Sequence, residues 1–482
     1  MKDQKTSLKV NAVLNVIKRI CSILFPMITF PFASRVLGKF YYGKVNFGAS
    51  IVSYLALIAE MGINNYSIRE GSRVKDNRKK LIELCNDLYS INIISTICSY
   101  IILLFLILFW KRLDGYAELL FVQSLGILFT TIGTDWINTI FEDYMYITVR
   151  YIICQFVSIS FMLIFVKGEQ DYVIYALASV SSVIIANITN RIYIKHKYNL
   201  EVKFNFNISM LKHLRPIIIL FSTSIASTIY VNSDITILGI LKSEKEVGLY
   251  SVASKIYILV KTMLNALLVV SIPRVSSMID KKSITVVSEY LSKIYGILLI
   301  IVFPACIGLA MLSKDIIQLF SGVEYIDATV SLMILSISLI FATSACFYIN
   351  VILIPFRLDK LALGSTFVSA FINIVLNFAL IPYGAQNAAA FTTLVSEFVM
   401  FVLGYLFTRK IIKLDVIKTF LLGILNACIT LLSCFFVKRM NLSMEFEIML
   451  SMFVSILSFC VVMLIYYRDF VKDYIFNNKR IR

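Results

Sequence analysis

Residues 91–109 read INIISTICSYIILLFLILF, a run of nineteen residues that contains no charged side chain. A helix crosses the hydrocarbon core of a bilayer with about 20 mostly apolar residues. The apolar residues in this run are continuous and do not alternate, which favours a membrane-spanning helix over a strand of a membrane barrel. The run therefore predicts a transmembrane helix over 82–109.

The remainder of the chain has the same character. Of its 482 residues, 59% are hydrophobic and 16% are charged, and the mean hydropathy is +0.84. Soluble chains are about 45–50% apolar and about 25% charged, and a soluble fold of this size exposes too much surface to bury the difference. The composition therefore predicts an all-α integral membrane protein.

About fourteen segments are long and apolar enough to span a membrane. Their expected limits are 10–36, 44–68, 82–109, 115–138, 142–166, 171–193, 214–241, 247–272, 287–312, 327–355, 359–381, 384–408, 414–437 and 445–467. The connections are short, and the longest, near 194–213, is too small to form a domain outside the membrane.

The basic start of the chain has no small-residue cleavage site behind it, so we expect a first span that is retained. The nine cysteines lie in or beside the spans without metal or disulfide spacing, so we expect them to be packing residues.

The distribution of Lys and Arg among the connections predicts the orientation. With both termini in the cytoplasm, 30 basic residues lie on the inside and 11 on the outside, as the positive-inside rule requires. We therefore expect a multi-pass protein with both termini in the cytoplasm. The net charge of +17 then reflects this bias and attraction to anionic lipid headgroups, and a nucleic-acid partner is not needed to explain it.

A weak internal repeat relates two parts of the chain. The sequence LG at 37–38, followed by GKVNFGASI at 43–51, resembles LG at 238–239, followed by GLYSVASKI at 248–256. Six expected spans separate the copies, so both have the same orientation, as in transporters with parallel repeats. The expected organisation is a six-helix lobe over 1–200, a second, pseudo-symmetric six-helix lobe over 201–410, and two additional helices with a basic tail over 411–482.

Five basic residues fall inside the expected spans, namely Lys18, Arg19, Arg150, Lys255 and Lys261. A cation at the bilayer centre costs about 2.5–3.5 kcal/mol, so each must extend to a headgroup, pair with an acid or face a water-filled cavity. Four of them lie about 8 residues, or about 12 Å, from the end of a span. The side chains of these four could instead extend to the headgroups at the membrane interface. Lys261 lies near mid-span. A central cavity between the two lobes would gather the five bases into a cationic substrate site.

Four acidic residues also fall inside the expected spans, namely Glu60, Asp135, Asp234 and Glu397. Each could neutralise a nearby base or couple transport to a proton or another ion, and both roles stay open. Asp234 ends a polar stretch of the seventh span. The hydroxyl and amide side chains of this stretch suit either a hydrated, sugar-binding wall or contacts between helices: Ser222, Ser224, Ser227, Thr228, Tyr230, Asn232 and Ser233.

A basic pocket between helices suits a diphosphate, because Arg and Lys match phosphate oxygens. Lipid-linked sugars carry such a diphosphate between a polyprenyl tail, which can stay in the bilayer, and a polar glycan, which must cross it. Outward movement of an anion also gains about 2.3 kcal/mol per charge per 100 mV. The charge pattern therefore predicts an exporter of an anionic, lipid-linked substrate.

Motifs along most of 10–410 resemble those of Wzx-type polysaccharide repeat-unit flippases, and they are specific as an ensemble rather than singly. In chain order they are FPFASRVLG (30–38), YGKVNF (42–47), MGIN (61–64), IRE (68–70), DW (135–136), EDY (142–144), YITVR (146–150), NSD (232–234), LG (238–239), VGLYSVASKI (247–256), PR (273–274), IP (354–355), NFALIPYG (377–384) and SE (396–397).

This resemblance implies the multidrug/oligosaccharidyl-lipid/polysaccharide exporter fold, with two lobes, a V-shaped MATE-like cavity and alternating access. It implies a flippase that moves undecaprenyl-diphosphate-linked repeat units of an O-antigen or capsule from the cytoplasmic to the outer face of a bacterial plasma (inner) membrane, coupled to a proton or sodium gradient. The implied partners are this lipid-linked glycan, membrane lipid, a polysaccharide polymerase and chain-length machinery, with no cofactor or metal. One departure is that Ser50 occupies the repeat position that matches Lys255, so the cavity charge is not symmetric.

Two other function classes were weighed against this one. A multidrug or organic-cation exporter of the same fold needs an acidic or apolar cavity, whereas bases outnumber acids within these spans. A membrane glycan polymerase or glycosyltransferase needs catalytic residues on larger outer loops, and the chain has no HExxH, phosphate loop or nucleophile elbow, so we do not expect an enzyme. The two histidines, His196 and His213, fall in a cytoplasmic connection and are expected to be solvated.

Overall fold

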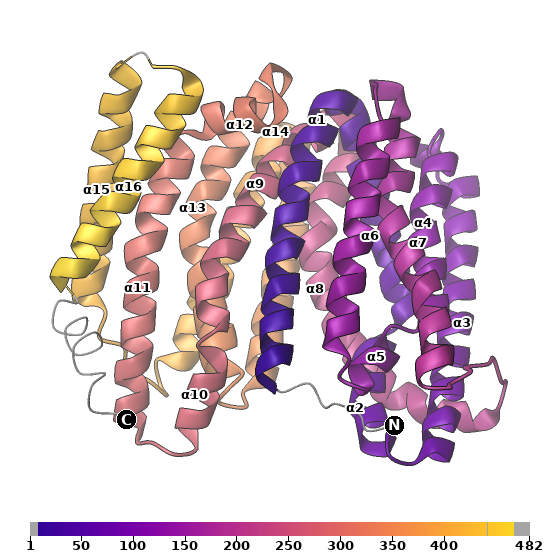
Figure 1. The fold of residues 1–482 in the computed structure, drawn as a ribbon. Coiled ribbons are helices and arrows are strands. Elements are labelled where there is room, and N and C mark those ends of the chain that lie inside the picture. Colours follow the sequence, from indigo (N-terminus) through magenta and orange to yellow (C-terminus); the bar gives the residue numbers. More distant parts are fainter. Residues whose placement is uncertain (1–7, 441, 467–482) are drawn as a thin grey trace. The chain divides into compact units, whose positions relative to one another are not determined.

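The computed structural model describes residues 8–440 and 442–466, and these form helices joined by short connections, without strands. The chain divides into two compact units, Met1–Gly248 and Leu249–Arg482. Within each unit the long helices run side by side (Figure 1). The all-α membrane fold expected from the sequence is confirmed.

Unit 1 is built from helices α1 to α8 and the first turn of α9. Their bounds are α1 (Leu8–Glu60), α2 (Ile63–Val74), α3 (Arg78–Phe109), η1 (Lys111–Leu113), α4 (Ala117–Gly133), α5 (Trp136–Ile140), α6 (Tyr144–Phe165), η2 (Glu169–Asp171), α7 (Tyr172–Lys197), η3 (Ile208–His213), α8 (Leu214–Leu241) and α9 (Glu244–Val269).

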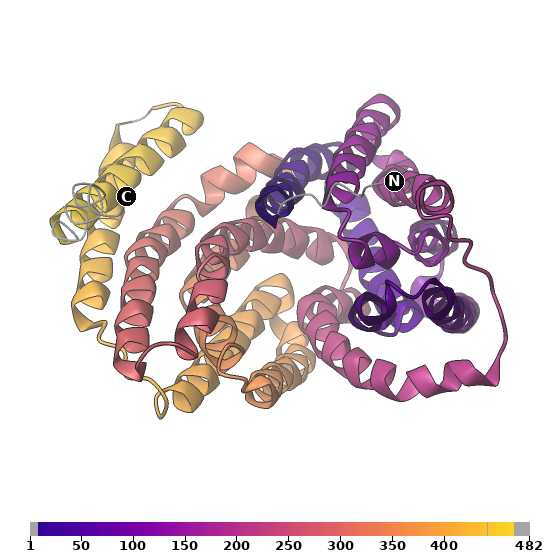
Figure 2. The same ribbon diagram turned by 60° about the horizontal axis from the view of Figure 1, so that its bottom comes forward.

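Unit 2 contains the rest of α9 and the helices that follow it. Their bounds are α10 (Ile272–Ile279), α11 (Ile284–Met311), α12 (Ser313–Ser321), η4 (Val323–Ala328), α13 (Thr329–Cys346), the π-helical turn η5 (Phe347–Leu353), α14 (Asp359–Thr408), α15 (Ile417–Arg439) and α16 (Met444–Tyr466). Figure 2 shows α15 and α16 at the side of unit 2, where both pack against α11.

Eleven helical segments of the described chain are long and apolar enough to cross a membrane. Two of them are interrupted inside, at Gly38 in α1 and at Ala385 in α14, and each is long enough for two crossings. Together with the shorter apolar helix Ala117–Gly133, they account for the fourteen expected spans. The chain is a multi-pass membrane protein.

Two span limits differ from the expected ones because the backbone turns earlier. The second span ends at Glu60, where Met61 and Gly62 adopt positive φ values of 46° and 76°, and α2 follows as a separate helix. A side chain at Gly62 would also lie 2.9 Å from the backbone nitrogen of Phe221 on α8. The fourth span ends at Gly133, since Thr134 is left-handed.

Small polar side chains join the helices inside unit 1. Ser99 on α3 donates to the carbonyl of Leu55 on α1 at 2.8 Å, and Ser158 on α6 donates to the carbonyl of Ala178 on α7 at 2.7 Å. Helices in lipid gain little from apolar contacts with one another, so close packing and hydrogen bonds between helices hold them together. The buried serines of the sequence are therefore packing residues here.

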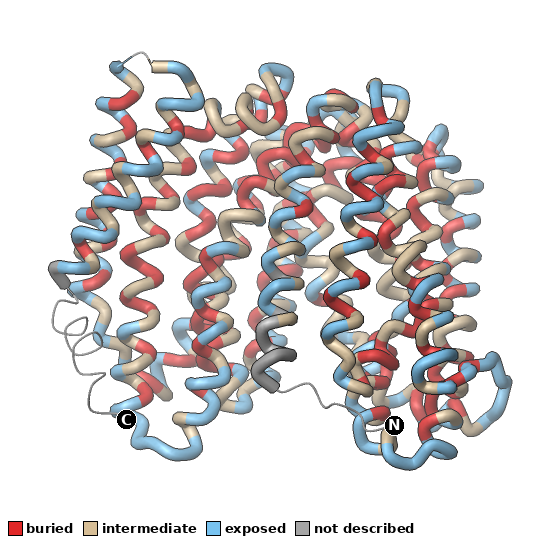
Figure 3. The backbone as a smooth tube through the Cα atoms, in the orientation of Figure 1, coloured by how far each residue is buried: buried red, intermediate tan, exposed pale blue. Residues whose placement is uncertain are grey.

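The lipid-facing surface is apolar. Leu108 and Phe109 on α3 and Phe453 on α16 are each more than 60% exposed, which in water would be a large unfavourable apolar area. Figure 3 shows exposed positions continuing along α15 and α16, interspersed with buried ones. This pattern is typical of helices whose outer side contacts acyl chains.

The contact-defined boundary lies at Gly248, whereas the expected lobe boundary lies at residue 200. The reason is that α8 packs against α1 and α2 of unit 1. The assignment of 1–200 and 201–410 as repeat-related lobes, with 411–482 as an addition, stays a prediction.

Candidate functional site

Arg150 and Asp135 form an ion pair inside unit 1. Arg150 lies on the second turn of α6, and Asp135 lies at the bend between α4 and α5. Nη2 of Arg150 donates to Oδ1 of Asp135, and the guanidinium lies 5.0 Å from the centroid of the Tyr146 ring. Only 8% of Arg150 is exposed. A charge desolvated to this degree requires a partner, and the Asp135 side chain, which is 47% exposed, supplies it from the edge of the buried region.

The guanidinium of Arg150 has donors beyond those that Asp135 uses. Its Nε and Nη1 atoms are buried and have no hydrogen-bond acceptor among the described residues. A buried donor without an acceptor costs about 1–3 kcal/mol, so such a group calls for a specific explanation. One explanation is that these donors are kept for an anionic ligand.

Two asparagines hold the bend that carries Asp135. Asn138 Nδ2 donates to Asn190 Oδ1 at 2.6 Å, and Asn190 Nδ2 donates to the carbonyl of Gly133 at 2.7 Å. Both asparagines are fully buried. These bonds tie the end of α4 and the short helix α5 to α7, so the position of the carboxylate is fixed by three helices.

Lys18 is half-buried on α1 and faces α6. Its ammonium lies 5.7 Å from the ring centroid of Tyr151, the residue that follows Arg150, and no ion pair involves Lys18 in the part of the chain that the structure describes. A cation over a tyrosine face is stabilised by the ring quadrupole. The side chain of Arg19 lies outside the described residues, so its predicted role is not addressed.

Lys261 and Glu397 form the corresponding ion pair of unit 2. Lys261 on α9 lies 2.5 Å from Oε1 of Glu397 on α14, and Tyr257 donates to the same oxygen at 3.1 Å. The Glu397 side chain is 3% exposed and that of Lys261 is 23% exposed. Tyr250 lies two helical turns before Tyr257 on α9, and its hydroxyl is 3.1 Å from Thr393 Oγ1. A polar stripe of α9 therefore packs along a polar stripe of α14.

The structure does not bring the other predicted residues into these two pairs. Lys255 is half-buried, and at about 100° per residue it lies on a different face of α9 from Lys261. Asp234 is buried on α8, and Glu60 is exposed at the end of α1. Asp135 and Glu397 each pair with a base, Arg150 and Lys261 respectively, so each acid balances the charge of its partner. A substrate-binding or ion-coupling role of the nine residues stays a prediction.

Three residues of the polar stretch of α8 bond to their own helix. Ser222, Ser224 and Asn232 donate to carbonyls four residues earlier. Thr236, just beyond the stretch, lies 3.0 Å from Ser50 and 3.3 Å from Tyr54 of α1. Both roles weighed from the sequence, a hydrated wall and contact between helices, stay predictions.

Comparison with known proteins identifies the family. The profile of the family described as polysaccharide biosynthesis protein matches residues 8–279, more than half of the chain. The chain belongs to this family. The matched region contains Arg150, Asp135 and Lys261, whereas Glu397 lies beyond it.

Individual relatives agree with this assignment. The chain is 22% identical over 346 residues to the "Putative O-antigen transporter" of Escherichia coli (strain K12), which is 70% of this chain and 81% of that one. Its fold is similar to the lipid II flippase MurJ in an inward closed conformation (TM-score 0.72, 18% identity, 96% and 99% of the two chains). It is also similar to an inward-facing multidrug resistance MATE family transporter of the MOP superfamily (TM-score 0.59, 13% identity, 82% and 97%).

None of these relatives is an enzyme, in agreement with the expectation for this member of the polysaccharide biosynthesis family. The structural likeness establishes the fold. The resemblance to repeat-unit flippases is confirmed by the family match and the O-antigen relative.

One cluster of this family member was not anticipated from its sequence. Arg112, expected only as an outer-loop charge, donates to Glu244 at 2.8 Å and to the carbonyl of Gly239 at 2.7 Å. Tyr116 donates to the same Glu244 oxygen at 2.8 Å. The cluster joins the α3–α4 connection to the turn between α8 and α9. Residues 112 and 244 are far apart in sequence, so no local pattern could reveal the pair.

His213 corrects a second expectation. It was expected to be solvated, yet it is buried, and its Nδ1 lies 2.8 Å from the Tyr66 hydroxyl. The η3 turn docks between α3 and α8, so the connection 194–213 packs against the helices. His196 is exposed, as expected.

Asp143, at the start of α6, is the acceptor of a second unanticipated cluster. Its Oδ2 accepts from Tyr193 at 2.6 Å, Lys197 at 2.6 Å and Tyr198 at 2.9 Å. Burial acts to raise the pKa of this carboxyl, but the hydrogen bonds from Lys197 and the two tyrosines outweigh it and lower the pKa below its usual value.

Asp143→Asn is expected to lower the free energy of unfolding by about 1 kcal/mol at pH 7. Because the folded pKa is depressed, the stabilisation is present above the unfolded pKa of about 3.9 and is lost as pH falls through the folded pKa. Thermal unfolding in detergent should therefore show a gap between wild type and variant that closes below about pH 4. Glu201→Gln removes an exposed carboxylate paired with Lys195 and should leave Tm unchanged; an equal shift in both variants would contradict the assignment.

Proposed function

We propose that this protein moves a polyprenyl-diphosphate-linked oligosaccharide repeat unit from the cytoplasmic to the outer face of a bacterial plasma membrane by alternating access. Membership of the polysaccharide biosynthesis family supports the substrate class. The similarity of its fold to a flippase and to a transporter supports transport across a bilayer.

The observation that carries the proposal is the buried guanidinium of Arg150. It sits within a membrane helix with one nitrogen on Asp135 and two nitrogens without an acceptor in the described chain. A diphosphate supplies the oxygen acceptors that these donors lack. Lys18 on α1, whose ammonium lies over the ring of Tyr151 and forms no ion pair in the described chain, adds a second positive charge for the anion.

In this proposal the acids adjust the charge of the site. Asp135 holds Arg150 in place while the substrate is absent and competes with the diphosphate for it, so a proton or sodium ion on Asp135 would free the guanidinium. Such exchange would couple transport to an ion gradient. The membrane potential adds about 2.3 kcal/mol per charge per 100 mV for an anion that leaves the cell.

Arg150→Ala is expected to reduce surface glycan at least about tenfold, since one charged hydrogen bond contributes about 1.5–3 kcal/mol, while the protein still inserts. The test expresses variants in a strain that lacks its own flippase and measures surface glycan and membrane protein level. Lys255→Ala, predicted from the sequence to have the same phenotype, is measured in parallel.

Arg191→Ala is the matched control for Arg150→Ala. Arg191 is another arginine of unit 1 that lies over a tyrosine, at 5.0 Å from the Tyr89 ring, but its acceptor is the carbonyl of Val202 and it has one buried nitrogen without an acceptor in the described chain, where Arg150 has two. A normal amount of surface glycan in Arg150→Ala, or an equal loss of surface glycan in Arg191→Ala, would contradict the assignment of Arg150 to substrate binding.

A multidrug or organic-cation exporter is the alternative, favoured only by the shared fold. Drug resistance conferred by expression, together with unchanged glycan in a flippase-deficient strain, would establish it. Interaction with a polysaccharide polymerase and cytoplasmic location of both termini belong to the same proposal, and reporter fusions to the termini test the latter.

A further inference from the structure

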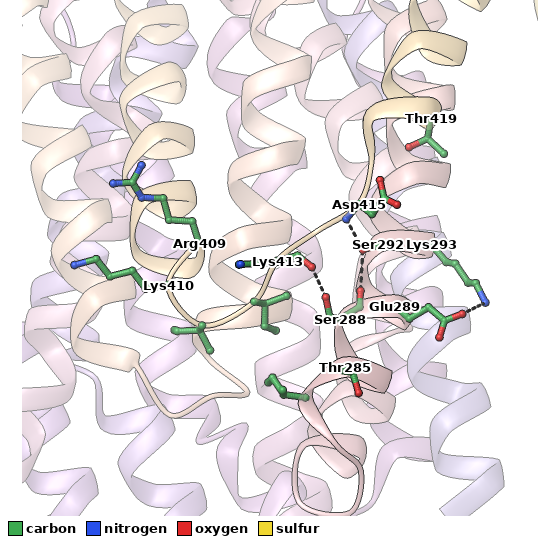
Figure 4. Close-up of a pocket in the computed structure, with 13 residues that line it drawn as sticks. Thr285, Ser288, Glu289, Ser292, Lys293, Arg409, Lys410, Lys413, Asp415 and Thr419 are labelled. Atoms are coloured by element: carbon green, nitrogen blue, oxygen red, sulfur yellow. Dashed lines mark hydrogen bonds and ion pairs between the residues drawn. The ribbon is translucent and has the colours of Figure 1, made fainter.

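A cavity of about 730 Å³ lies at the foot of unit 2, between the start of α11, the end of α14 and the loop 409–416. Figure 4 shows its lining residues. Arg409 and Lys410 directly follow α14, and the Lys413 side chain points toward the side on which they lie. All three are exposed, and none forms an ion pair in the part of the chain that the structure describes.

The acids at this cavity do not cancel its charge. Glu289 is paired with Lys293 at 3.1 Å, four residues along α11, and Figure 4 shows this pair pointing away from the loop. Asp415 remains as the one other carboxylate among the lining residues. The cavity is therefore cationic, and by the distribution of Lys and Arg it is predicted to lie at the cytoplasmic face.

A second cavity, of about 710 Å³, adjoins the first, and Asp415 lines both. Half of its lining residues are aromatic, among them Phe303, Phe341, Tyr405 and Phe420. Apart from Asp415, its polar groups are hydroxyls, those of three tyrosines and Ser344, and Ser344 Oγ already accepts a hydrogen bond from Tyr295 at 3.0 Å. This cavity is suited to a hydrocarbon chain.

Two hydrogen bonds to α11 fix the loop between the two cavities. Ser288 donates to the carbonyl of Lys413, and the backbone nitrogen of Asp415 donates to Ser292 Oγ at 3.0 Å. The loop is thus attached to α11 on one side and continues α14 on the other. A site built on such a fixed loop suits a resident ligand rather than one that passes through.

We propose that this paired site binds an anionic phospholipid, with its phosphate at Arg409, Lys410 and Lys413 and an acyl chain in the aromatic cavity. Basic pockets between helices at a cytoplasmic face are typical sites for acidic lipid headgroups. The lipid would join α15 to α11 and α14 at the base of unit 2. This role is separate from the proposed transport substrate.

Native mass spectrometry of the full chain in detergent tests the proposal with phosphatidylglycerol and with phosphatidylcholine of the same acyl chains. Wild type is expected to bind phosphatidylglycerol more tightly. The triple variant Arg409→Ala/Lys410→Ala/Lys413→Ala should lose this preference by at least about tenfold. The control Lys281→Ala/Lys282→Ala/Lys360→Ala removes three exposed bases of the same unit that do not line the cavity, and it should keep the preference.

The aromatic cavity is tested separately. Phe420→Ala should weaken binding of both lipids, whereas Phe435→Ala, an equally exposed phenylalanine on the same helix outside the cavity, should not. Equal affinity for the two lipids, or equal losses in the two triple variants, would overturn the proposal. Glycerol phosphate or inorganic phosphate binding as tightly as the lipid would also overturn it, in favour of a site for free anions.

Discussion

Lys261→Met is expected to destabilise the protein by about 3–5 kcal/mol, the cost of removing one partner of a buried ion pair. The reason is that Glu397, whose side chain is 3% exposed, then keeps, among the described residues, the hydrogen bond from Tyr257 alone. Glu397→Met should cost less, because the 23% exposed Lys261 can move its ammonium toward water. Thermal unfolding of the full chain in detergent measures both.

The double variant Lys261→Met/Glu397→Met separates stability from transport. Replacing both partners by apolar residues of similar volume is often neutral for stability, so Tm should return toward wild type. If surface glycan also returns, the pair is structural; if glycan stays absent while the protein is stable, the charges act in transport.

Lys293 provides the control for Lys261. It pairs with Glu289 on the surface of α11 at 3.1 Å, and exposed pairs contribute about 0–1 kcal/mol. Lys293→Met should therefore leave stability almost unchanged. If Lys293→Met lowered the stability as much as Lys261→Met, burial of the ion pair would not explain the destabilisation.

Gly248→Ala and Gly43→Ala are expected to cost about 1–3 kcal/mol each or more, as overpacking does, and to lower the amount of folded protein in the membrane. A Cβ at Gly248 would lie 2.0 Å from the carbonyl oxygen of Lys39, and one at Gly43 would lie 1.8 Å from the carbonyl oxygen of Glu244. The atoms that a methyl group would meet belong to the backbone, so no side-chain rotation relieves the clash.

Gly364→Ala is the matched control for these two substitutions. Gly364 lies inside α14 with no atom within 4 Å of an added Cβ, and alanine is the better helix former by about 1 kcal/mol. This variant should be neutral or stabilising in the same thermal unfolding assay. A Gly248→Ala protein as stable as Gly364→Ala would contradict the close backbone approach.

The sequence alone determined that the chain is a multi-pass helical membrane protein, because long uncharged runs such as 91–109 can satisfy their backbone in lipid only as helices. It also determined which charges needed an explanation, since the cost of Lys261 or Arg150 in hydrocarbon depends on position along a span and little on the rest of the fold. The glycines at 43 and 248 were visible as corresponding positions of a repeat, but their mutual contact was not.

Only the tertiary structure decided which acid meets which base. Asp135 and Arg150 are 15 residues apart and Glu397 and Lys261 are 136 apart, and hydropathy says nothing about the rotation of one helix against another. Hydropathy also could not show that His213, in a polar connection, is buried where η3 packs against α3 and α8. Membrane insertion is a local property of each segment, whereas partner choice depends on helix packing, and packing is a property of the whole folded unit.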